Sequence, residues 1–336
     1  MSTEIQVVGI DVSKRKLDIA LVGDGKIKTK VFENTAAGHS LLQAWLEERD
    51  VHPGGAHICF EATGPYSERL ATTLADAGWR VSVVNPARIK GFSQSELARN
   101  KTDKADAALI ARFCLALRPE PWTPPPPAYR QLRAWVDRLD SLKEMHQQEL
   151  NRLEAHRSSD QRDVAAHVQP HVDWLATEIV KLKGDIDDHI DRHPDLKTDT
   201  ALMESIPGIG GTTAVKVLAY LGDIRRFDNA KALAAFVGVT PRQHQSGSSA
   251  QKRTMLSRKG HAAARRALYM PGLVARRHNP ALKLFGDRLR DKGLAPKAVI
   301  GAVMRKLLHI IYGVLTSGRE FDLKLALPRL DAQDGI

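Results

Sequence analysis

The order of hydrophobic and polar positions predicts an α/β fold for the first third of the chain. There, short apolar runs typical of buried strands alternate with segments whose apolar residues recur at helical spacing. The expected strands are residues 5–12, 16–23, 26–33, 56–63 and 80–86, and the expected helices are 36–49, 65–78 and one that begins at residue 103. Three consecutive strands followed by strands that alternate with helices predict an RNase H-like sheet over residues 1–118.

A proline-rich linker is expected at residues 119–128, because the four consecutive prolines at 124–127 cannot continue a helix. Two long helices with apolar seams follow over residues 129–198. They predict a helical hairpin or coiled coil that packs on itself or on a second subunit, with a plain helical arm of a monomer as the alternative. The seam positions are Leu132, Val136, Leu139, Leu142, Met145, Leu150 and Leu153, then Val168, Val172, Leu175, Ile179, Leu182 and Ile186.

The remaining part, residues 199–330, has the pattern of a mostly α-helical domain. Two of its helices flank the glycine-rich stretch SIPGIGGTTA at residues 205–214. A polar loop that can include short strands is expected at residues 240–260, and long helices are expected at 261–280 and 296–315. The chain shows no repeat of fixed period.

Charge narrows the range of partners. The 336 residues carry a formal net charge of +11, with an isoelectric point of about 9.7, which favours a polyanionic partner such as nucleic acid. Cys59 and Cys114 lie among apolar residues and are expected to be buried and reduced. Without a signal-peptide pattern, zinc-ligand spacing or a membrane-length apolar run, a soluble cytoplasmic protein is expected.

Four acidic residues suggest a metal site. Asp11 and Glu61 each lie at the end of a predicted buried strand, and Asp103 and Asp106 lie three residues apart in the first turn of a predicted helix. In an RNase H-like sheet these elements meet, and hard carboxylate oxygens suit Mg²⁺ or Mn²⁺. Taken singly, each residue has an ordinary explanation as a turn residue, a cap or a helix-start acid.

The stretch GIDVSK around Asp11 also resembles the start of sugar kinases and actin-like ATPases. That fold needs a duplicated domain with a second such strand and a glycine-rich adenosine loop. Neither pattern follows the proline-rich linker. A metal site in a single RNase H-like domain is therefore the preferred interpretation.

Three features of the last domain point to nucleic acid. The glycine-rich stretch, with Gly208 and Gly210, has the helix-hairpin-helix pattern, in which exposed backbone N–H groups hold a phosphate; an ordinary turn is the alternative. Ser246 lies in the polar loop near His244. A serine in such a loop is usually a solvated linker residue, and a nucleophilic serine needs a base or a metal to activate it. Cations are dense in the region that follows and include Lys252, Arg253, Arg258, Lys259, Arg265 and Arg266.

These motifs occur in the same order in one known family. The chain resembles the DEDD transposases of the insertion-sequence-one-ten group, which are similar to the Piv-type DNA invertases. The matching segments are GIDVSK, FEATG, NKTDKADA, IPGIG, residues 221–247 and SRKGHAAARRALY. The resemblance implies a RuvC-like N-terminal domain, a coiled-coil arm and a C-terminal transposase domain.

The resemblance also implies roles for individual residues. Asp11, Glu61, Asp103 and Asp106 match the acidic tetrad of the family, which holds Mg²⁺. Ser246 matches its nucleophilic serine, although Ser248 and Ser249 follow closely. In the implied reaction the serine attacks a DNA phosphate, forms a phosphoserine and frees a 3′-hydroxyl. A new 3′-hydroxyl then attacks the phosphoserine after strand exchange.

The implied partners are donor and target DNA, a structured non-coding bridge RNA that pairs with both, and further copies of the chain as a dimer or tetramer on the nucleoid. Two other functions stay open from the residues alone. One is a metal-dependent nuclease or junction resolvase that uses water as nucleophile. The other is a nucleic-acid-binding protein without catalysis.

Overall fold

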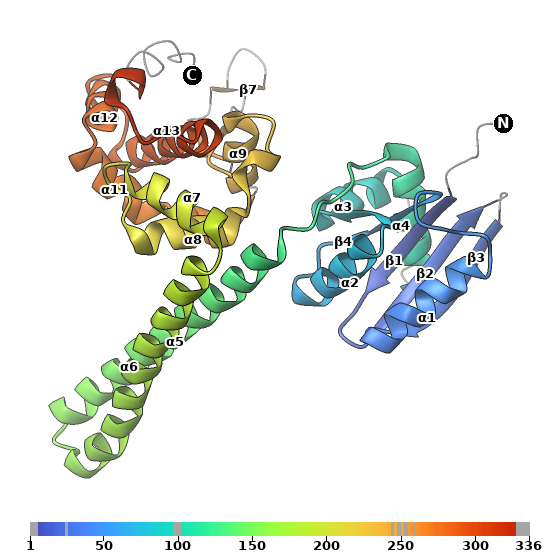
Figure 1. The fold of residues 1–336 in the computed structure, drawn as a ribbon, viewed down its shortest axis with the longest axis horizontal. Helices are drawn as coiled ribbons and strands as arrows, with labels where there is room; N and C mark the ends of the chain where they lie inside the picture. Colours follow the sequence, from blue (N-terminus) through green and yellow to red (C-terminus); the bar gives the residue numbers. More distant parts are fainter. Residues whose placement is uncertain are drawn as a thin grey trace. The chain divides into compact units, whose positions relative to one another are not determined.

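The computed structural model describes residues 6–23, 26–96, 103–242, 245–246, 250–251, 255–257 and 260–326. The chain divides into two compact units, Met1–Pro124 and Pro125–Ile336. The first unit is an α/β fold with one mixed β-sheet and helices packed on it, and the second is mostly helical (Figure 1). This division into an α/β part and a helical part confirms the prediction from the hydrophobic pattern.

The first unit is built on a five-stranded sheet with the order β3-β2-β1-β4-β5. Strands β1, β2 and β3 form an antiparallel meander, while β4 and β5 run parallel to β1. Strand β3 is largely exposed, as expected of an edge. The strands are β1 (Gln6–Val12), β2 (Lys16–Gly23), β3 (Lys26–Glu33), β4 (Ala56–Glu61) and β5 (Arg80–Val84).

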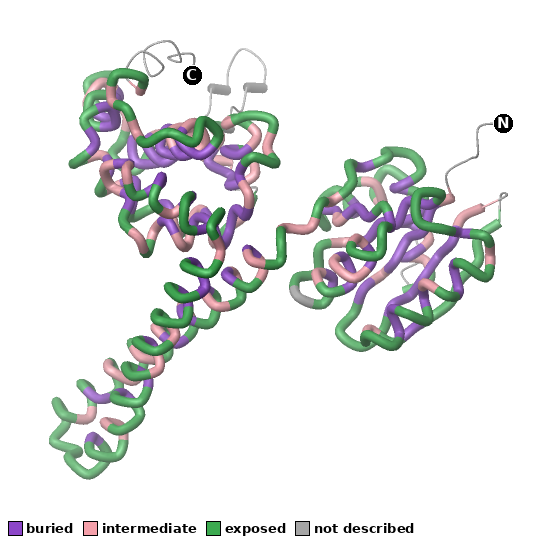
Figure 2. The backbone as a smooth tube through the Cα atoms, viewed as in Figure 1, coloured by how far each residue is buried: buried purple, intermediate pink, exposed green. Residues whose placement is uncertain are grey.

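Helices cover both faces of this sheet because its central strands alternate two sets of apolar side chains. One face carries Ile10 and Phe60 and packs with α1 (Ala36–Glu47) and α2 (Pro65–Asp76). The other carries Val7 and Cys59 and packs with α4 (Asp103–Leu117). Figure 2 shows the central strands of this sheet as largely buried.

Gly9 sets the distance between α4 and the sheet. A Cβ atom at this position would lie 2.2 Å from the Ala107 carbonyl oxygen and 2.4 Å from the Ala111 nitrogen. Only glycine therefore allows the backbone of α4 to rest directly on β1. This contact brings the start of α4 over the strand that carries Asp11.

Helix α3 (Pro86–Ser95) lies between the strand expected at 80–86 and the helix expected from residue 103, where the sequence analysis expected neither a helix nor a strand. The side chain of Asn85 caps it by accepting a hydrogen bond from the Ala87 N–H, and Pro86 lies in its first turn. Only Ile89 of this helix is buried. The sequence analysis missed this helix because it has almost no apolar stripe. Its Asn-Pro start is nevertheless a recognisable helix signal.

The second unit begins with a helical hairpin of α5 (Pro127–Ser158) and α6 (Arg162–Asp191), which pack along each other. Much of the predicted seam is buried, including Leu132, Leu139 and Leu175. Met145, in contrast, is 43% exposed near the middle of the seam. The hairpin is thus confirmed as a pair of packed helices.

The rest of the second unit is a helical domain packed around α13 (Pro296–Ser317). Contrary to the expectation that the chain has no membrane-length apolar run, helix α13 is long and apolar enough to cross a membrane. Most of it is buried by its neighbours, as is typical of a core helix. The segment expected as one helix at 261–280 is divided at Leu268. The other elements are α7 (Pro194–Glu204), α8 (Gly211–Leu221), η1 (Ile224–Arg226), α9 (Ala230–Val237), α10 (Ala262–Ala267), α11 (Tyr269–His278), α12 (Pro280–Asp291) and the two-residue strands β6 (Pro241–Arg242), β7 (Gln245–Ser246), β8 (Ala250–Gln251) and β9 (Met255–Leu256).

A buried carboxylate, Asp199 of α7, links the base of the hairpin to the helical domain. The guanidinium of Arg225 donates to both carboxylate oxygens of Asp199, at 2.7 and 2.9 Å. The hydroxyl of Tyr129, in the first turn of α5, donates to the same carboxylate at 3.2 Å. Because Asp199 is only 2% exposed, these bonds satisfy a charge that would otherwise be costly to bury.

Candidate active site

The structure brings the four predicted acidic residues together. Asp11 is two residues after Gly9 on β1, and Glu61 is two residues after Cys59 on β4. Residues two apart in a strand lie on the same face of the sheet, and here that face is the one that α4 covers. Asp103 and Asp106 lie in the first turn of α4. All four residues line one cavity of about 830 Å³ in the first unit.

Strand β2 adds two charged residues that the sequence analysis missed. Asp18 is directly opposite Asp11 in the antiparallel ladder and is only 4% exposed. The ammonium group of Lys16 lies 2.6 Å from Asp103 Oδ2 and 3.2 Å from Asp18 Oδ2. The pairing register, which cannot be read from one strand alone, places this acid and this cation beside the four carboxylates.

The electrostatics of the cluster show that its carboxylates repel one another. Burial raises the pKa of Asp11 above its ordinary value, and the negative charges of Asp106 and Asp103 raise it further. The hydrogen bond from Lys16 has the opposite effect on Asp103 and lowers its pKa. One cation therefore offsets part of the negative charge in a site that is rich in carboxylates.

The donor set of this cavity fits a hard divalent cation. Carboxylate oxygens are the ligands that Mg²⁺ and Mn²⁺ prefer. In this structure the ammonium group of Lys16 supplies the positive charge beside Asp103. Within the described part of the chain, no three His, Cys, Asp or Glu side chains already form a compact ligand group. The four residues thus surround a common space without closing around it.

Helix α3, which the sequence analysis missed, forms another wall of the cavity. Lys90, Ser93 and Gln94 line it from this helix. Arg112 of α4 also lines it and bonds to Glu96 at 2.9 Å. The cations and polar groups on this wall suit a phosphate that approaches the carboxylates.

Asn34 links the turn that follows Asp11 to the first turn of α2, which follows Glu61. Its side-chain amide donates to the carbonyl of Ser13 at 2.8 Å and to that of Tyr66 at 3.2 Å. Its carbonyl oxygen lies 2.8 Å from Nε2 of His39, which is fully buried. A residue remote in sequence from the acids therefore helps to hold the strand ends that carry them.

Ser246 lies in the second unit, within the polar loop that the sequence predicted. Its backbone belongs to β7, and it pairs with Ala250 of β8 in a short antiparallel ladder. Five residues of interest in this loop lie outside the described residues: His244, Ser248, Ser249, Lys252 and Arg253. Arg258 and Lys259 lie outside them as well.

The glycine-rich stretch forms a tight connection between α7 and α8, as its pattern predicted. Gly208 has a φ of +102°, and a Cβ there would lie 2.6 Å from the Cα of Ala275. At Gly210, in contrast, a Cβ would point into open space. The first glycine is required by packing, whereas nothing in the fold requires the second.

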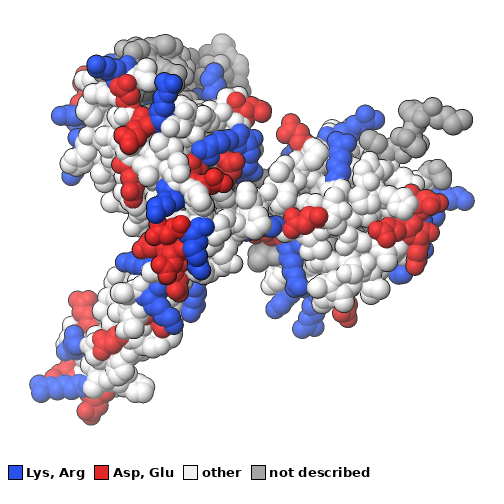
Figure 3. All heavy atoms as spheres, in the orientation of Figure 1, with Lys and Arg blue, Asp and Glu red and all other residues white. Residues whose placement is uncertain are grey.

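The two predicted cations on α10 differ in their surroundings. Arg265 donates a hydrogen bond to the carbonyl of Val237 at 3.0 Å, within the fold. Arg266 is exposed. In the view of Figure 3, Lys and Arg side chains are interspersed with Asp and Glu on both units. The net positive charge of the chain is therefore not visible as one continuous patch on that face.

Comparison with known proteins identifies related families. Residues 8–157 match the DEDD transposase model of the IS110 type, described as "Transposase". Residues 200–287 match the model described as "Transposase IS116/IS110/IS902 family". The first match covers all four acidic residues, and the second covers the glycine-rich connection and Ser246.

Similar proteins extend over almost the whole chain. The "Pilin gene-inverting protein" of Moraxella bovis and that of Moraxella lacunata are each 32% identical over 319 residues, which is 95% of this chain and 98% of theirs. The "Transposase for insertion sequence element IS1111A" of Coxiella burnetii is 35% identical over 144 residues, 40% of this chain and 37% of its own. With a DEDD-type α/β unit, a transposase unit and relatives of matching length, this chain belongs to the IS110-type family of transposases and is a DNA recombinase.

Proposed function

We propose that this recombinase cuts and rejoins the DNA of an insertion sequence through a covalent phosphoserine at Ser246, with a divalent metal held by Asp11, Glu61, Asp103 and Asp106. One observation carries the metal part of the proposal. Carboxylates from two strands and a helix line a single cavity. In this view the first unit is a RuvC-like domain.

The proposed reaction consists of two transesterifications with no net loss of phosphodiester bonds. The oxygen of Ser246 forms a bond to the DNA phosphorus, while the bond from phosphorus to the 3′-oxygen breaks. The serine loses its proton, and the freed 3′-hydroxyl gains one. After strand exchange, a new 3′-hydroxyl attacks the phosphoserine and restores the free serine.

The four carboxylates and their neighbours have defined tasks in this scheme. Asp11 and Glu61 are fixed by β1 and β4, and the α4 pair completes the set of oxygen ligands. Bound Mg²⁺ or Mn²⁺ would supply Lewis-acid stabilisation of charge on the phosphate oxygens. Lys16, whose ammonium group lies 2.6 Å from Asp103, offsets part of the repulsion among the acids and would give up this contact when the metal binds.

We further propose that donor and target DNA are selected with a structured non-coding RNA, the bridge RNA. The resemblance to the family and the formal net charge of +11 support this proposal. The connection at Gly208 and Gly210 acts as a helix-hairpin-helix that holds a phosphate by backbone N–H groups. The enzyme then works in the cytoplasm on the nucleoid.

The helical hairpin of α5 and α6 is proposed to act as a coiled-coil arm that joins subunits into a dimer, which assembles to a tetramer. Its two helices extend over 32 and 30 residues. Exposed apolar side chains on α6, such as Trp174 at 51% and Val180 at 69%, leave surface for such a contact.

The decisive experiment asks whether protein becomes joined to DNA through Ser246. The full chain is incubated with Mg²⁺, with RNA transcribed from the non-coding flank of its element, and with a nicked substrate on which strand exchange cannot finish. We expect a covalent adduct whose modified peptide contains Ser246 by mass spectrometry. Ser246→Ala abolishes both the adduct and cleavage, and Asp103→Ala abolishes them as well.

The matched controls are Ser248→Ala and Ser249→Ala, which keep the adduct. A Ser246→Ala protein that still cuts DNA would favour the competing mechanism, a RuvC-like nuclease or junction resolvase that uses water. An adduct on Ser248 or Ser249 would move the nucleophile to that residue.

A further inference from the structure

Three apolar side chains stand out on the surface of α11. Tyr269 is 45% exposed, Met270 is 61% exposed and Val274 is 40% exposed. Met270 and Val274 are four residues apart, so they lie on the same side of the helix. Exposed apolar residues that adjoin in this way indicate a binding surface more often than single ones do.

This surface is continuous with the glycine-rich connection. A groove of about 350 Å³ is lined on one side by Gly208, Ile209, Gly210 and Thr213, and on the other by Met270, Pro271 and Val274. Gly208 lies so close to Ala275 that a Cβ atom on Gly208 would be 2.6 Å from the Cα of Ala275. The two walls of the groove are therefore in direct contact at this point. A ligand that contacts one wall therefore meets the other.

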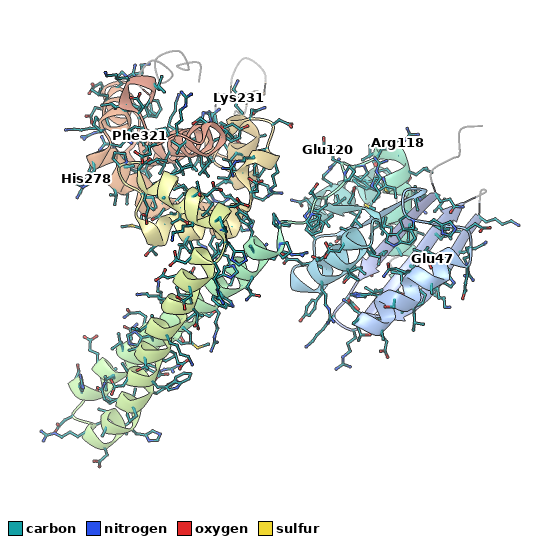
Figure 4. All side chains as sticks on the ribbon, in the orientation of Figure 1. Glu47, Arg118, Glu120, Lys231, His278 and Phe321 are labelled. Carbon is teal, nitrogen blue, oxygen red and sulfur yellow. The ribbon has the colours of Figure 1, made fainter. Side chains whose placement is uncertain are left out.

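Positive charge borders the apolar side chains. The segment 262–278 contains four arginines and no acidic residue. Arg276 is bonded to Asp287 at 3.0 Å, whereas Arg266 and Arg277 are exposed. His278, at the end of α11, is also exposed and lies at the edge of the second unit in the view of Figure 4.

We propose that the α11 face, defined by Tyr269, Met270, Val274 and Arg277 of α11 together with Arg266 at the end of the adjoining α10, binds the sugar-phosphate backbone of duplex DNA beside the hairpin. Sugars of the backbone offer apolar edges to Met270 and Val274, and phosphates on either side accept from the two arginines. The inference rests on the proposed phosphate contact of the hairpin and extends it to a second wall of the same groove.

Charge argues against a second copy of the chain as the occupant. A symmetric contact between two α11 faces would bring Arg266 and Arg277 of one subunit close to the same residues of the other. Like charges in such an interface oppose association. A polyanion with apolar edges matches both the cations and the apolar side chains.

The test measures the affinity of the full chain for a duplex DNA of the element's end at several salt concentrations, by fluorescence anisotropy. The double variant Met270→Ala/Val274→Ala is expected to bind about 10-fold more weakly, with the same dependence on salt. Arg266→Ala and Arg277→Ala are each expected to reduce the slope of log K against log salt by about 1. Leu284→Ala, which removes an equally exposed apolar side chain from α12, leaves the affinity unchanged.

Gly210→Ala separates this inference from the proposed function. Its methyl group fits the fold but enters the groove, so it weakens DNA binding if the hairpin holds a phosphate. Weak binding by Gly210→Ala together with normal binding by the Met270/Val274 variant overturns the α11 inference and keeps the hairpin contact. Normal binding by both overturns both.

Two other results would also contradict the proposal. One is a loss confined to RNA duplexes, with binding to DNA intact. The other is a change in oligomeric state of the Met270→Ala/Val274→Ala protein, seen by light scattering, because that would assign the face to subunit contact. Circular dichroism and thermal unfolding of each variant verify that the loss of binding does not come from misfolding.

Discussion

At the scale of single residues, the site depends on a balance between acids and one cation. Asp11, Asp103 and Asp18 all interact with Lys16, whose own pKa is raised above its ordinary value chiefly by its hydrogen bond to Asp103. Asp11 alone is a strand-end residue and Asp103 a helix-start residue, whereas Asp18 is buried within β2. Together they make a site that attracts positive charge.

Lys16→Met is expected to strengthen the binding of Mn²⁺ several-fold, because the metal would no longer compete with the ammonium group for Asp103. The signal of free Mn²⁺ in electron paramagnetic resonance measures the dissociation constant directly. Lys14→Met, in the exposed turn just before β2, is the matched control and leaves it unchanged. Weaker binding by Lys16→Met would instead mean that the lysine holds the carboxylates in position.

At the scale of elements, the site depends on how closely α4 approaches the sheet. The helix contacts β1, β2 and β4, and its fully buried positions include Ala107, Ala111 and Phe113. Its first turn supplies two of the four carboxylates. Any change that lifts α4 from β1 therefore affects both the stability of the unit and the geometry of the cavity.

Gly9→Ala is expected to destabilise the first unit by about 3 kcal/mol, since the added methyl group meets backbone atoms that cannot rotate away. Chemical unfolding followed by circular dichroism gives the free energy of unfolding. Gly91→Ala, in the exposed helix α3 where a Cβ meets nothing within 4 Å, is the control and should be neutral or slightly stabilising. Equal stability of Gly9→Ala and the unchanged protein would contradict this packing argument.

At the scale of the whole molecule, the proposed chemistry requires groups that belong to different units. The four carboxylates lie in Met1–Pro124, and Ser246 lies in Pro125–Ile336. A proline-rich stretch connects the units, and α5 begins at Pro127. The chemistry alone does not require that one subunit supplies both sets of residues.

Mixing two inactive variants tests whether one subunit supplies both the carboxylates and Ser246. We expect that Asp11→Ala protein and Ser246→Ala protein, each inactive alone, recover part of the recombination activity when mixed, because the proposed dimer can combine an intact acidic set with an intact serine. Product formation measured by quantitative PCR reports the recovery. The double variant Asp11→Ala/Ser246→Ala mixed with either single variant is the control. No recovery in stable mixed dimers would mean that each active site comes from one chain.

Local patterns in the sequence predicted much of this molecule. Strand alternation gave the sheet, the heptad-like spacing gave the α5–α6 hairpin, and SIPGIGGTTA gave the connection before α8, because each of these signals is carried by neighbouring residues. The positions of Asp11, Glu61, Asp103 and Asp106 at element ends also made the cavity predictable once the sheet order was assumed. Helix α3 was missed because its one buried residue, Ile89, leaves almost no apolar period.

The sequence by itself thus determined most of the elements and their order, and it pointed to the four acids that line the cavity. Only the tertiary structure decided that Lys16 and Asp18 join those acids, that Gly9 sets the height of α4, and that Met270 and Val274 share a groove with Gly210. The physical reason is that these relations depend on strand register and on contacts between segments far apart along the chain. Composition and local period carry no record of such contacts.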